Sequence, residues 1–130
     1  MAKILLVDDD PEFNSSLKQC LEFSGHDVIT AFDGKQGLEL FQQEQPDVLI
    51  TDIIMPEIDG LELILKLATK TETNDYAFPC KVIAISGGGR FAGDNYLDCA
   101  DAIGVDAIIA KPLSLIELDN TIKSLLGNAA

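Results

Sequence analysis

The chain has 130 residues, of which 47% are hydrophobic and 24% charged, and its formal net charge is −13. This length and balance predict a single globular domain over residues 1–130, and no apolar run reaches the roughly 20 residues that a membrane span needs. An acidic surface repels phosphate backbones and anionic lipids, so we expect no direct contact with nucleic acid or membranes.

The start of the chain and its cysteines both indicate the cytoplasm. Residues 1–7 lack the long apolar segment and small-residue cleavage site of a secretory signal. Cys20, Cys80 and Cys99 are odd in number, distant in sequence and without a C-x-x-C pair. We therefore expect reduced thiols that act as small buried apolar residues, and neither a disulfide nor a metal site.

The chain opens with two units of a strand followed by a helix. Residues 4–7 (ILLV) form a continuous apolar run, which predicts a strand buried on both faces. A capping aspartate and a proline then open a helical pattern that ends at Gly25. A second strand is expected over residues 28–31, and a capping box of Asp33 and Gln36 opens the second helix.

The middle of the chain holds the third strand, at residues 48–51, which leads directly into Asp52. Residues 61–68 carry apolar side chains at helical spacing and predict the third helix. The stretch 69–80 is polar and long for a connection, so we expect an exposed loop there. The fourth strand follows at residues 82–85.

The last third of the chain begins with a loop, residues 86–89 (SGGG), that glycine makes flexible. Residues 95–103 then predict a helix and residues 107–110 the fifth strand. A second capping box opens the final helix, over residues 115–126. Five strands thus alternate with five helices.

Such alternation indicates an α/β fold, a doubly wound five-stranded parallel sheet with helices on both faces. In these sheets the ligand site lies beyond the carboxyl ends of the strands. Polar and charged residues directly follow four of the five predicted strands. They are Asp8 and Asp9, Asp52, Ser86 and Lys111.

The predicted edge would bring the carboxylates of Asp8, Asp9 and Asp52 together. Like charges repel, so this cluster calls for a cation, and its oxygen ligands favour Mg²⁺, Mn²⁺ or Ca²⁺ over zinc. A divalent ion and Lys111 would balance three carboxylates, and would let the site tolerate a phosphoryl group on Asp52. An aspartate can act as the nucleophile in such a transfer.

Each piece alone has a plainer interpretation. Acidic residues after a strand often only cap a helix, Asp52 could be a turn residue, Lys111 a surface lysine, and Ser86 part of a mobile loop. The joint arrangement, with one piece at each strand end in chain order, favours a site.

These residues resemble the bacterial two-component response-regulator receiver family, and in particular its single-domain, chemotaxis-type members. Residues 4–9 (ILLVDD) are similar to the family's first strand and acidic pair, and residues 47–60 (DVLITDIIMPEIDG) to its phosphorylation segment. Ser86 stands where the family keeps threonine or serine, and Lys111 and Pro112 where it keeps lysine and a cis-proline. The resemblance covers essentially the whole chain and implies the sheet order 2-1-3-4-5.

The resemblance also implies a phosphorelay function. Asp52 would accept a phosphoryl group from a histidine kinase or a histidine phosphotransfer protein. Mg²⁺, or Mn²⁺ as an alternative, would be bound by Asp9, Asp52 and the backbone carbonyl of Ile54, with Asp8 acting mainly through water. The protein would be a signalling protein that assists its own phosphorylation and dephosphorylation, not an enzyme in the usual sense.

Phosphorylation would be reported by a switch region. Lys111 would contact the phosphate, and the Ser86 hydroxyl would bond a phosphoryl oxygen, with Gly87 and Ile108 taking part in the change. A downstream target would bind the face made by the fourth helix, the fifth strand and the fifth helix. These elements are predicted at residues 95–103, 107–110 and 115–126.

Two departures from the family leave alternatives open. The position of Ile108 is commonly tyrosine or phenylalanine in the family, and Gly87 begins an unusually permissive loop. A pseudo-receiver, which binds partners and never carries phosphate, is therefore a rival hypothesis. A flavodoxin-type binder would need a phosphate-cradling loop where the acidic run stands, and an aspartyl-phosphate hydrolase would need a cap for which the chain is short. We expect a free-standing receiver or phosphate shuttle, with a fragment of a longer protein as the alternative.

Overall fold

The computed structural model of the chain describes residues 2–53, 60–70, 76–86, 104–110 and 114–127. Its strands are β1 (Lys3–Val7), β2 (Asp27–Ala31), β3 (Val48–Asp52), β4 (Thr69–Lys70), β5 (Tyr76–Ala77), β6 (Lys81–Ser86) and β7 (Ala107–Ala110). Its helices are α1 (Pro11–Phe23), α2 (Gly34–Glu44), α3 (Gly60–Leu67) and α5 (Leu115–Leu125).

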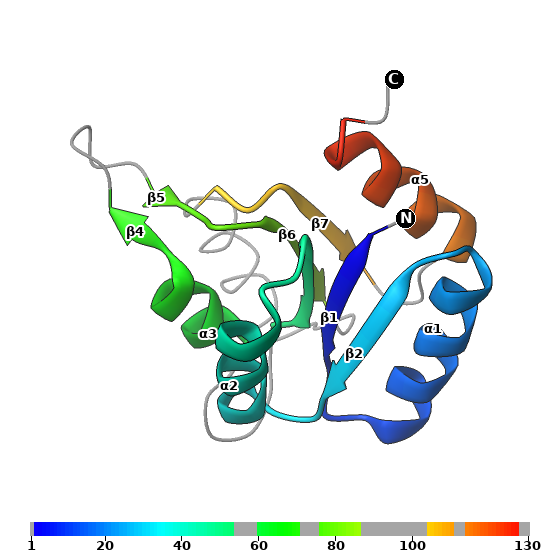
Figure 1. Cartoon of the computed structure of the whole chain (residues 1–130), viewed down its shortest axis with the longest axis horizontal. Coiled ribbons are helices and arrows are strands. Elements are labelled where there is room, and N and C mark those ends of the chain that lie inside the picture. Colours follow the sequence, from blue (N-terminus) through cyan, green and yellow to red (C-terminus); the bar gives the residue numbers. More distant parts are fainter. Residues whose placement is uncertain (1, 54–59, 71–75, 87–103, 111–113, 128–130) are drawn as a thin grey trace.

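Five of these strands form one parallel sheet in the order β2-β1-β3-β6-β7 (Figure 1). Since β6 and β7 are the fourth and fifth strands of this sheet along the chain, the order equals the predicted 2-1-3-4-5. The predicted α/β fold class is thereby confirmed. All five strands point the same way, so their carboxyl ends share one edge of the sheet.

The sheet separates two layers of helices because alternate residues of a strand face opposite sides. Ile4 and Leu6 of β1 belong to the apolar core beneath α1 and α5, whereas Leu5 and Val7 belong to the core beneath α2 and α3. Figure 1 shows α1 and α5 on one side of the sheet and α2 and α3 on the other. These strand residues are fully buried, which explains why their runs are continuously apolar.

The predicted helix starts are present, with one difference in detail. Asp10 caps α1 by accepting hydrogen bonds from the amides of Glu12 and Phe13. Asp33 accepts from the amide of Gln36, but the Gln36 side chain bonds the amide of Phe32. The capping box therefore closes one residue before the position expected for it.

The stretch predicted to be an exposed loop, residues 69–80, contains the short antiparallel pair β4 and β5. Thr69 pairs with Ala77 and Lys70 with Tyr76. A ladder of two residues per strand is too short to produce a hydrophobic period, which is why the pattern did not predict it. The predicted helix at 95–103, and most of the loop at 86–89, lie outside the described residues.

Cys20 and Cys80 are free and half-buried, which differs from the full burial expected, and Cys99 lies outside the described residues. Among the described residues, no helix is long and apolar enough to cross a membrane.

A hydrogen-bonded chain fastens α5 to the start of the sheet. The buried His26, in the turn before β2, accepts the amide N–H of Ala2 at its Nδ1 atom, 3.2 Å away. The other ring nitrogen, Nε2, therefore carries the proton and donates a hydrogen bond to Oδ1 of Asp119, 3.0 Å away. Lys123 pairs with Oδ2 of the same carboxylate at 3.0 Å.

The carboxylate of Asp119 makes the stability of this junction depend on pH. The hydrogen bond from His26, helped by Lys123, holds the pKa of Asp119 below its ordinary value, although partial burial opposes the shift. A carboxyl group with a lowered folded-state pKa contributes stability above its unfolded pKa, and this contribution is lost as the pH falls through the folded pKa.

We predict that wild type is more stable than Asp119→Asn near neutral pH, and that this difference shrinks as the pH falls below about 4. Urea unfolding followed by circular dichroism at several pH values measures the difference. Asp27→Asn, at an exposed position with the same change of charge, serves as the control. A difference that stays constant from neutral to acid pH would contradict the assignment.

Candidate functional site

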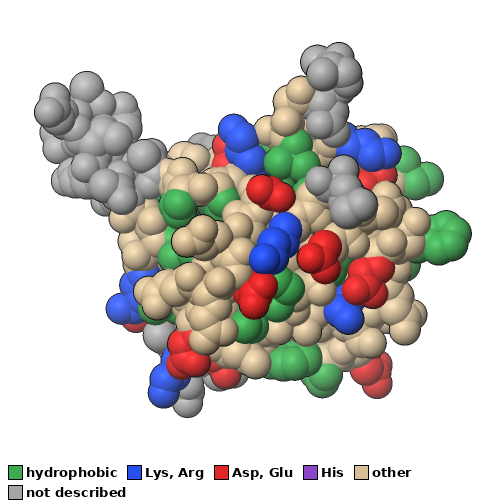
Figure 2. All heavy atoms as spheres, viewed as in Figure 1, with side chains coloured by type: hydrophobic (Ala, Val, Ile, Leu, Met, Phe, Trp, Pro, Cys, Tyr) green, Lys and Arg blue, Asp and Glu red, His purple; other side chains and the backbone are tan. Residues whose placement is uncertain are grey.

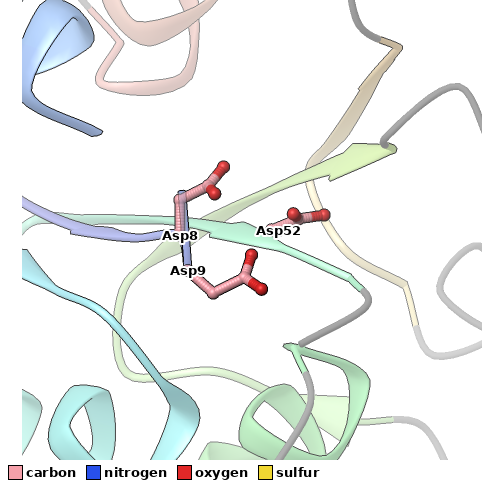
Figure 3. A group of neighbouring side chains, drawn as sticks. All are labelled: Asp8, Asp9 and Asp52. Atoms are coloured by element: carbon pink, nitrogen blue, oxygen red, sulfur yellow. The ribbon is translucent and has the colours of Figure 1, made fainter. Parts of the chain in front are cut away.

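Three aspartates meet at the carboxyl edge of the sheet. Asp8 and Asp9 directly follow β1, and Asp52 is the last residue of the neighbouring strand β3. One carboxylate oxygen from each residue lies within 4.8 Å of the other two. Figure 3 shows the three side chains close together, with Asp8 and Asp9 beyond the end of β1 and Asp52 on β3. The convergence predicted from the sequence is therefore confirmed for these three residues.

The three carboxylates differ in their exposure to solvent. Asp8 is only 1% exposed and Asp52 7%, whereas Asp9 is exposed. Burial removes much of the water that would screen the charges of Asp8 and Asp52, so the repulsion within the cluster is stronger than it would be at the surface. The cluster is thus a concentration of negative charge with one exposed side, at Asp9.

Hydrogen bonds fix the strand ends that carry these side chains. Asp8 accepts the amide of Asp10 at Oδ1, 2.9 Å away, and its own amide donates to the carbonyl of Ala31 in β2 at 3.1 Å. The buried Thr51 hydroxyl donates to the carbonyl of Asp52 at 2.9 Å. The carboxylates therefore project from backbone whose position is determined by the sheet.

This donor set fits a divalent cation. All three ligand atoms are carboxylate oxygens, which Mg²⁺, Mn²⁺ and Ca²⁺ prefer, and the open side at Asp9 leaves room for water or a substrate oxygen. A bound cation would offset the repulsion that the fold otherwise carries. The residues present therefore fit the metal that the sequence predicted.

The structure describes the remaining predicted site residues only in part. Ser86 ends β6 and pairs with Ala110, one position beyond the pairing of Asp52 with Ile85, so its backbone lies at the same edge. Its side chain lies outside the described part of the chain, as do Lys111, Gly87 and the carbonyl of Ile54.

Ile108, predicted to belong to the switch region, is half-buried in β7. It packs against the core on the α2 and α3 side of the sheet. Its neighbour Ile109 faces the opposite core. The branched side chain thus occupies a core position, in place of the aromatic ring that the receiver family commonly has there.

A second hollow, a groove of about 1020 Å³, opens at the opposite, amino edge of the sheet. It is lined by Asp47, Asp106 and Cys80 among others, and by none of the clustered aspartates. Asp47 and Asp106 already accept backbone amides, those of Lys3 at 2.9 Å and Val82 at 2.8 Å. Asp47 and Asp106 each stand one residue before a strand, and their carboxylates hold neighbouring strands through these hydrogen bonds. Their role is therefore structural.

The thiol in this groove has little nucleophilic character. Burial, opposed by a backbone hydrogen bond from Leu49 and reinforced by Asp106 and Asp47, raises the pKa of Cys80 to about 12. The thiolate is the reactive form of cysteine, and it is scarce at neutral pH when the pKa is this high. This groove is therefore a weaker candidate for a functional site than the carboxylate cluster.

The rest of the surface offers a less specific signal. Figure 2 shows acidic and basic side chains interspersed over one face, with hydrophobic side chains in separate small areas. That pattern is typical of a charged, soluble surface and does not mark a site.

One residue at the site was not found from the sequence. Asn14 is fully buried in α1 and donates hydrogen bonds to the carbonyls of Asp8 and Ala31. The signal available was a polar residue on the buried face of α1, three positions before Leu17. That signal predicts burial, but it does not identify the partners.

Comparison with known proteins gives a consistent family. Residues 4–123 match the family described as the response regulator receiver domain. The chain is 36% identical to the response regulator MprA of Mycobacterium leprae over 124 residues, which are 95% of this chain and 50% of MprA. It is 32% identical to the alkaline phosphatase synthesis transcriptional regulatory protein PhoP of Bacillus subtilis over 126 residues, 95% of this chain and 48% of PhoP. The chain spans about half the length of the curated relatives it matches.

Solved structures agree with the fold. The receiver domain of Francisella response regulator 1452 matches all of this chain and all of its own, with a TM-score of 0.79 and 28% identity. A response regulator receiver domain protein from Clostridium thermocellum matches 98% of this chain and 96% of its own, with a TM-score of 0.79 and 27% identity.

We predict that Mg²⁺ raises the melting temperature and that Asp9→Asn removes most of this rise. A cation at about a hundred times its dissociation constant adds about 2.7 kcal/mol to the unfolding free energy of a protein that binds it only when folded. Without metal, Asp9→Asn should melt at a higher temperature than wild type, because the substitution removes one of the three mutually repelling charges. Thermal melts with and without Mg²⁺, at matched ionic strength, measure both effects.

The control for this experiment is the neighbouring variant Asp10→Asn. It removes the same charge, but asparagine caps a helix about as well as aspartate. Equal responses of the two variants to Mg²⁺ would show that the clustered carboxylates do not bind the ion.

Proposed function

The chain belongs to the response regulator receiver domain family of two-component signalling proteins, and from this premise we propose that Asp52 is its phosphate acceptor. The phosphoryl group would come from a phosphohistidine on a histidine kinase or a histidine phosphotransfer protein. The observation that carries the proposal is the meeting of Asp8, Asp9 and Asp52 at one strand edge, with oxygen atoms within 4.8 Å.

The geometry suits an in-line transfer to a carboxylate. A carboxylate oxygen of Asp52 would attack phosphorus as the bond to the histidine nitrogen breaks, and that nitrogen would then take a proton from solvent. Mg²⁺ bound there would supply positive charge opposite the phosphoryl oxygens. Asp8 and Asp9 would hold this charge beside Asp52, and the exposure of Asp9 leaves one side of the cluster open to a partner.

The remaining site roles belong to this proposal. Lys111 would contact the phosphate, Ser86 would bond a phosphoryl oxygen, and the carbonyl of Ile54 would complete the metal ligands. Mg²⁺ is the proposed ion, with Mn²⁺ as the alternative, because a carboxylate cluster with an open side suits an octahedral ion that keeps several waters. Gly87 and its neighbours would supply the freedom for Ser86 to approach the phosphate.

The reporting face would comprise residues 95–103, β7 and α5. The half-buried Ile108 packs into a core and has no ring that could swing between two environments. We therefore place the moving part in the loop that begins at Gly87, and not in a rotation of residue 108.

The wider description of the protein is also proposed. Residues 1–130 would act as a single receiver domain in the cytoplasm, as a signalling protein and not an enzyme, through docking to partners and without direct contact to nucleic acid. PhoP and the TrcR protein of Mycobacterium tuberculosis are described as transcriptional regulatory proteins, and this chain covers 48% and 46% of their lengths. The proposal on nucleic acid therefore concerns this domain alone.

We predict that acetyl phosphate and Mg²⁺ convert the protein to a species heavier by about 80 Da, the mass of one phosphoryl group. Mass spectrometry of the intact protein measures the adduct. Asp52→Asn should prevent it, and Asp10→Asn should not, since Asp10 caps α1. An unchanged wild-type mass would favour the pseudo-receiver hypothesis, and an adduct on Asp52→Asn would move the acceptor elsewhere.

We also predict that phosphorylation changes amide hydrogen exchange in β7 and α5 more than in β2 and α1. The first pair belongs to the proposed reporting face, whereas the second pair lies toward the opposite edge of the sheet. Exchange measured by mass spectrometry on phosphorylated protein and on Asp52→Asn makes the comparison. Equal changes in the two regions would remove the reporting face from the proposal.

A further inference from the structure

Asn14 is a polar side chain on the otherwise apolar buried face of α1. It lies on the buried face of α1 with Leu17 and Leu21, and it is 0% exposed. Its Nδ2 atom donates one hydrogen bond to the carbonyl of Asp8 at 3.0 Å and another to the carbonyl of Ala31 at 2.9 Å. Both protons of the amide group are thus used at the carboxyl ends of two strands.

These two bonds hold the main chain at the start of the carboxylate cluster. The amide of Asp8 already donates to the carbonyl of Ala31, so Asp8 is held through both its amide and its carbonyl. The carbonyl of Asp8 shares a planar peptide unit with the amide nitrogen of Asp9. Fixing this carbonyl therefore fixes the plane from which Asp9 projects.

The orientation of the Asn14 amide follows from its partners. Both are carbonyl oxygens, which only accept hydrogen bonds, so the donating Nδ2 must face them. The other atom, Oδ1, is buried and has no hydrogen-bond partner among the described residues. A buried acceptor without a partner costs about 1–3 kcal/mol, so asparagine is a costly way merely to fill this space.

We propose that Asn14 is a positioning residue for the cation site, which orders Asp8 and Asp9 before the cation binds. The inference rests on the proposed function, because it takes the carboxylate cluster to bind Mg²⁺. Groups that orient metal ligands without touching the metal commonly contribute tenfold or more to its affinity. In this chain the orienting group acts through a backbone carbonyl.

The test compares the Mg²⁺ dissociation constants of Asn14→Leu and Leu17→Ala by titration calorimetry. Asn14→Leu keeps the approximate volume and removes both donors, and we expect about tenfold weaker Mg²⁺ binding. Leu17→Ala damages the same buried face of α1 without touching the carbonyl of Asp8, so its affinity should stay within about twofold of wild type. Temperatures well below each melting point keep every variant folded.

A second readout needs neither metal nor activity. The amide of Asp10 donates to Oδ1 of Asp8 at 2.9 Å, so its hydrogen exchange reports the order of the Asp8 side chain. In metal-free protein this amide should exchange faster in Asn14→Leu than in wild type or in Leu17→Ala. Asn14→Ala, which removes the donors without adding apolar atoms, replaces Asn14→Leu if the latter does not fold.

The outcomes separate this inference from the proposed function. If wild type itself does not bind Mg²⁺, the metal site fails and the inference fails with it. If wild type binds Mg²⁺ and both Asn14 variants bind it equally well, with normal exchange at Asp10, only the role of Asn14 is overturned. Weaker binding in Leu17→Ala as well would reduce Asn14 to a general packing role.

Discussion

Repulsion among three carboxylates is the main physical constraint on the carboxyl edge of the sheet. Asp8, Asp9 and Asp52 lie within 4.8 Å of one another, and two of them are buried. Free side chains would move apart into water, but these project from strand ends that neighbouring strands hold in register. Strand pairing therefore keeps the like charges together. A cluster of carboxylates held in this way is suited to bind a cation.

Aspartates lie at both edges of the sheet, but in different surroundings. At the amino edge, Asp47 and Asp106 accept amides of neighbouring strands, so their charges stabilise the fold. At the carboxyl edge three carboxylates lie within 4.8 Å of one another, where like charges repel, although Asp8 also accepts the amide of Asp10. The meeting of three carboxylates makes the carboxyl edge a stronger candidate for a functional site than the groove at the amino edge.

The sequence predicts most of the sheet and part of the site, for identifiable reasons. Runs such as residues 4–7 are short, continuously apolar and followed by polar residues, as strands buried on both faces are, and residues at the carboxyl ends of adjacent parallel strands lie close together. The β4–β5 pair is too short to produce a period. The roles of Asn14 and His26 depend on partners remote in sequence, Ala31 and Asp119. A single sequence read for local patterns does not contain those pairings.

The location of the cluster also has a kinetic consequence. In the unfolded chain, Asp8 and Asp52 are separated by the segments that form α1, β2 and α2 in the folded domain, and they meet only when β1 and β3 are paired. Their repulsion is therefore absent early in folding and is greatest in the completed sheet. A cation that binds only the completed cluster acts on the native side of the folding barrier, where it slows unfolding more than it speeds folding. The lifetime of the folded domain, and not only its equilibrium stability, would then vary with the concentration of divalent ions.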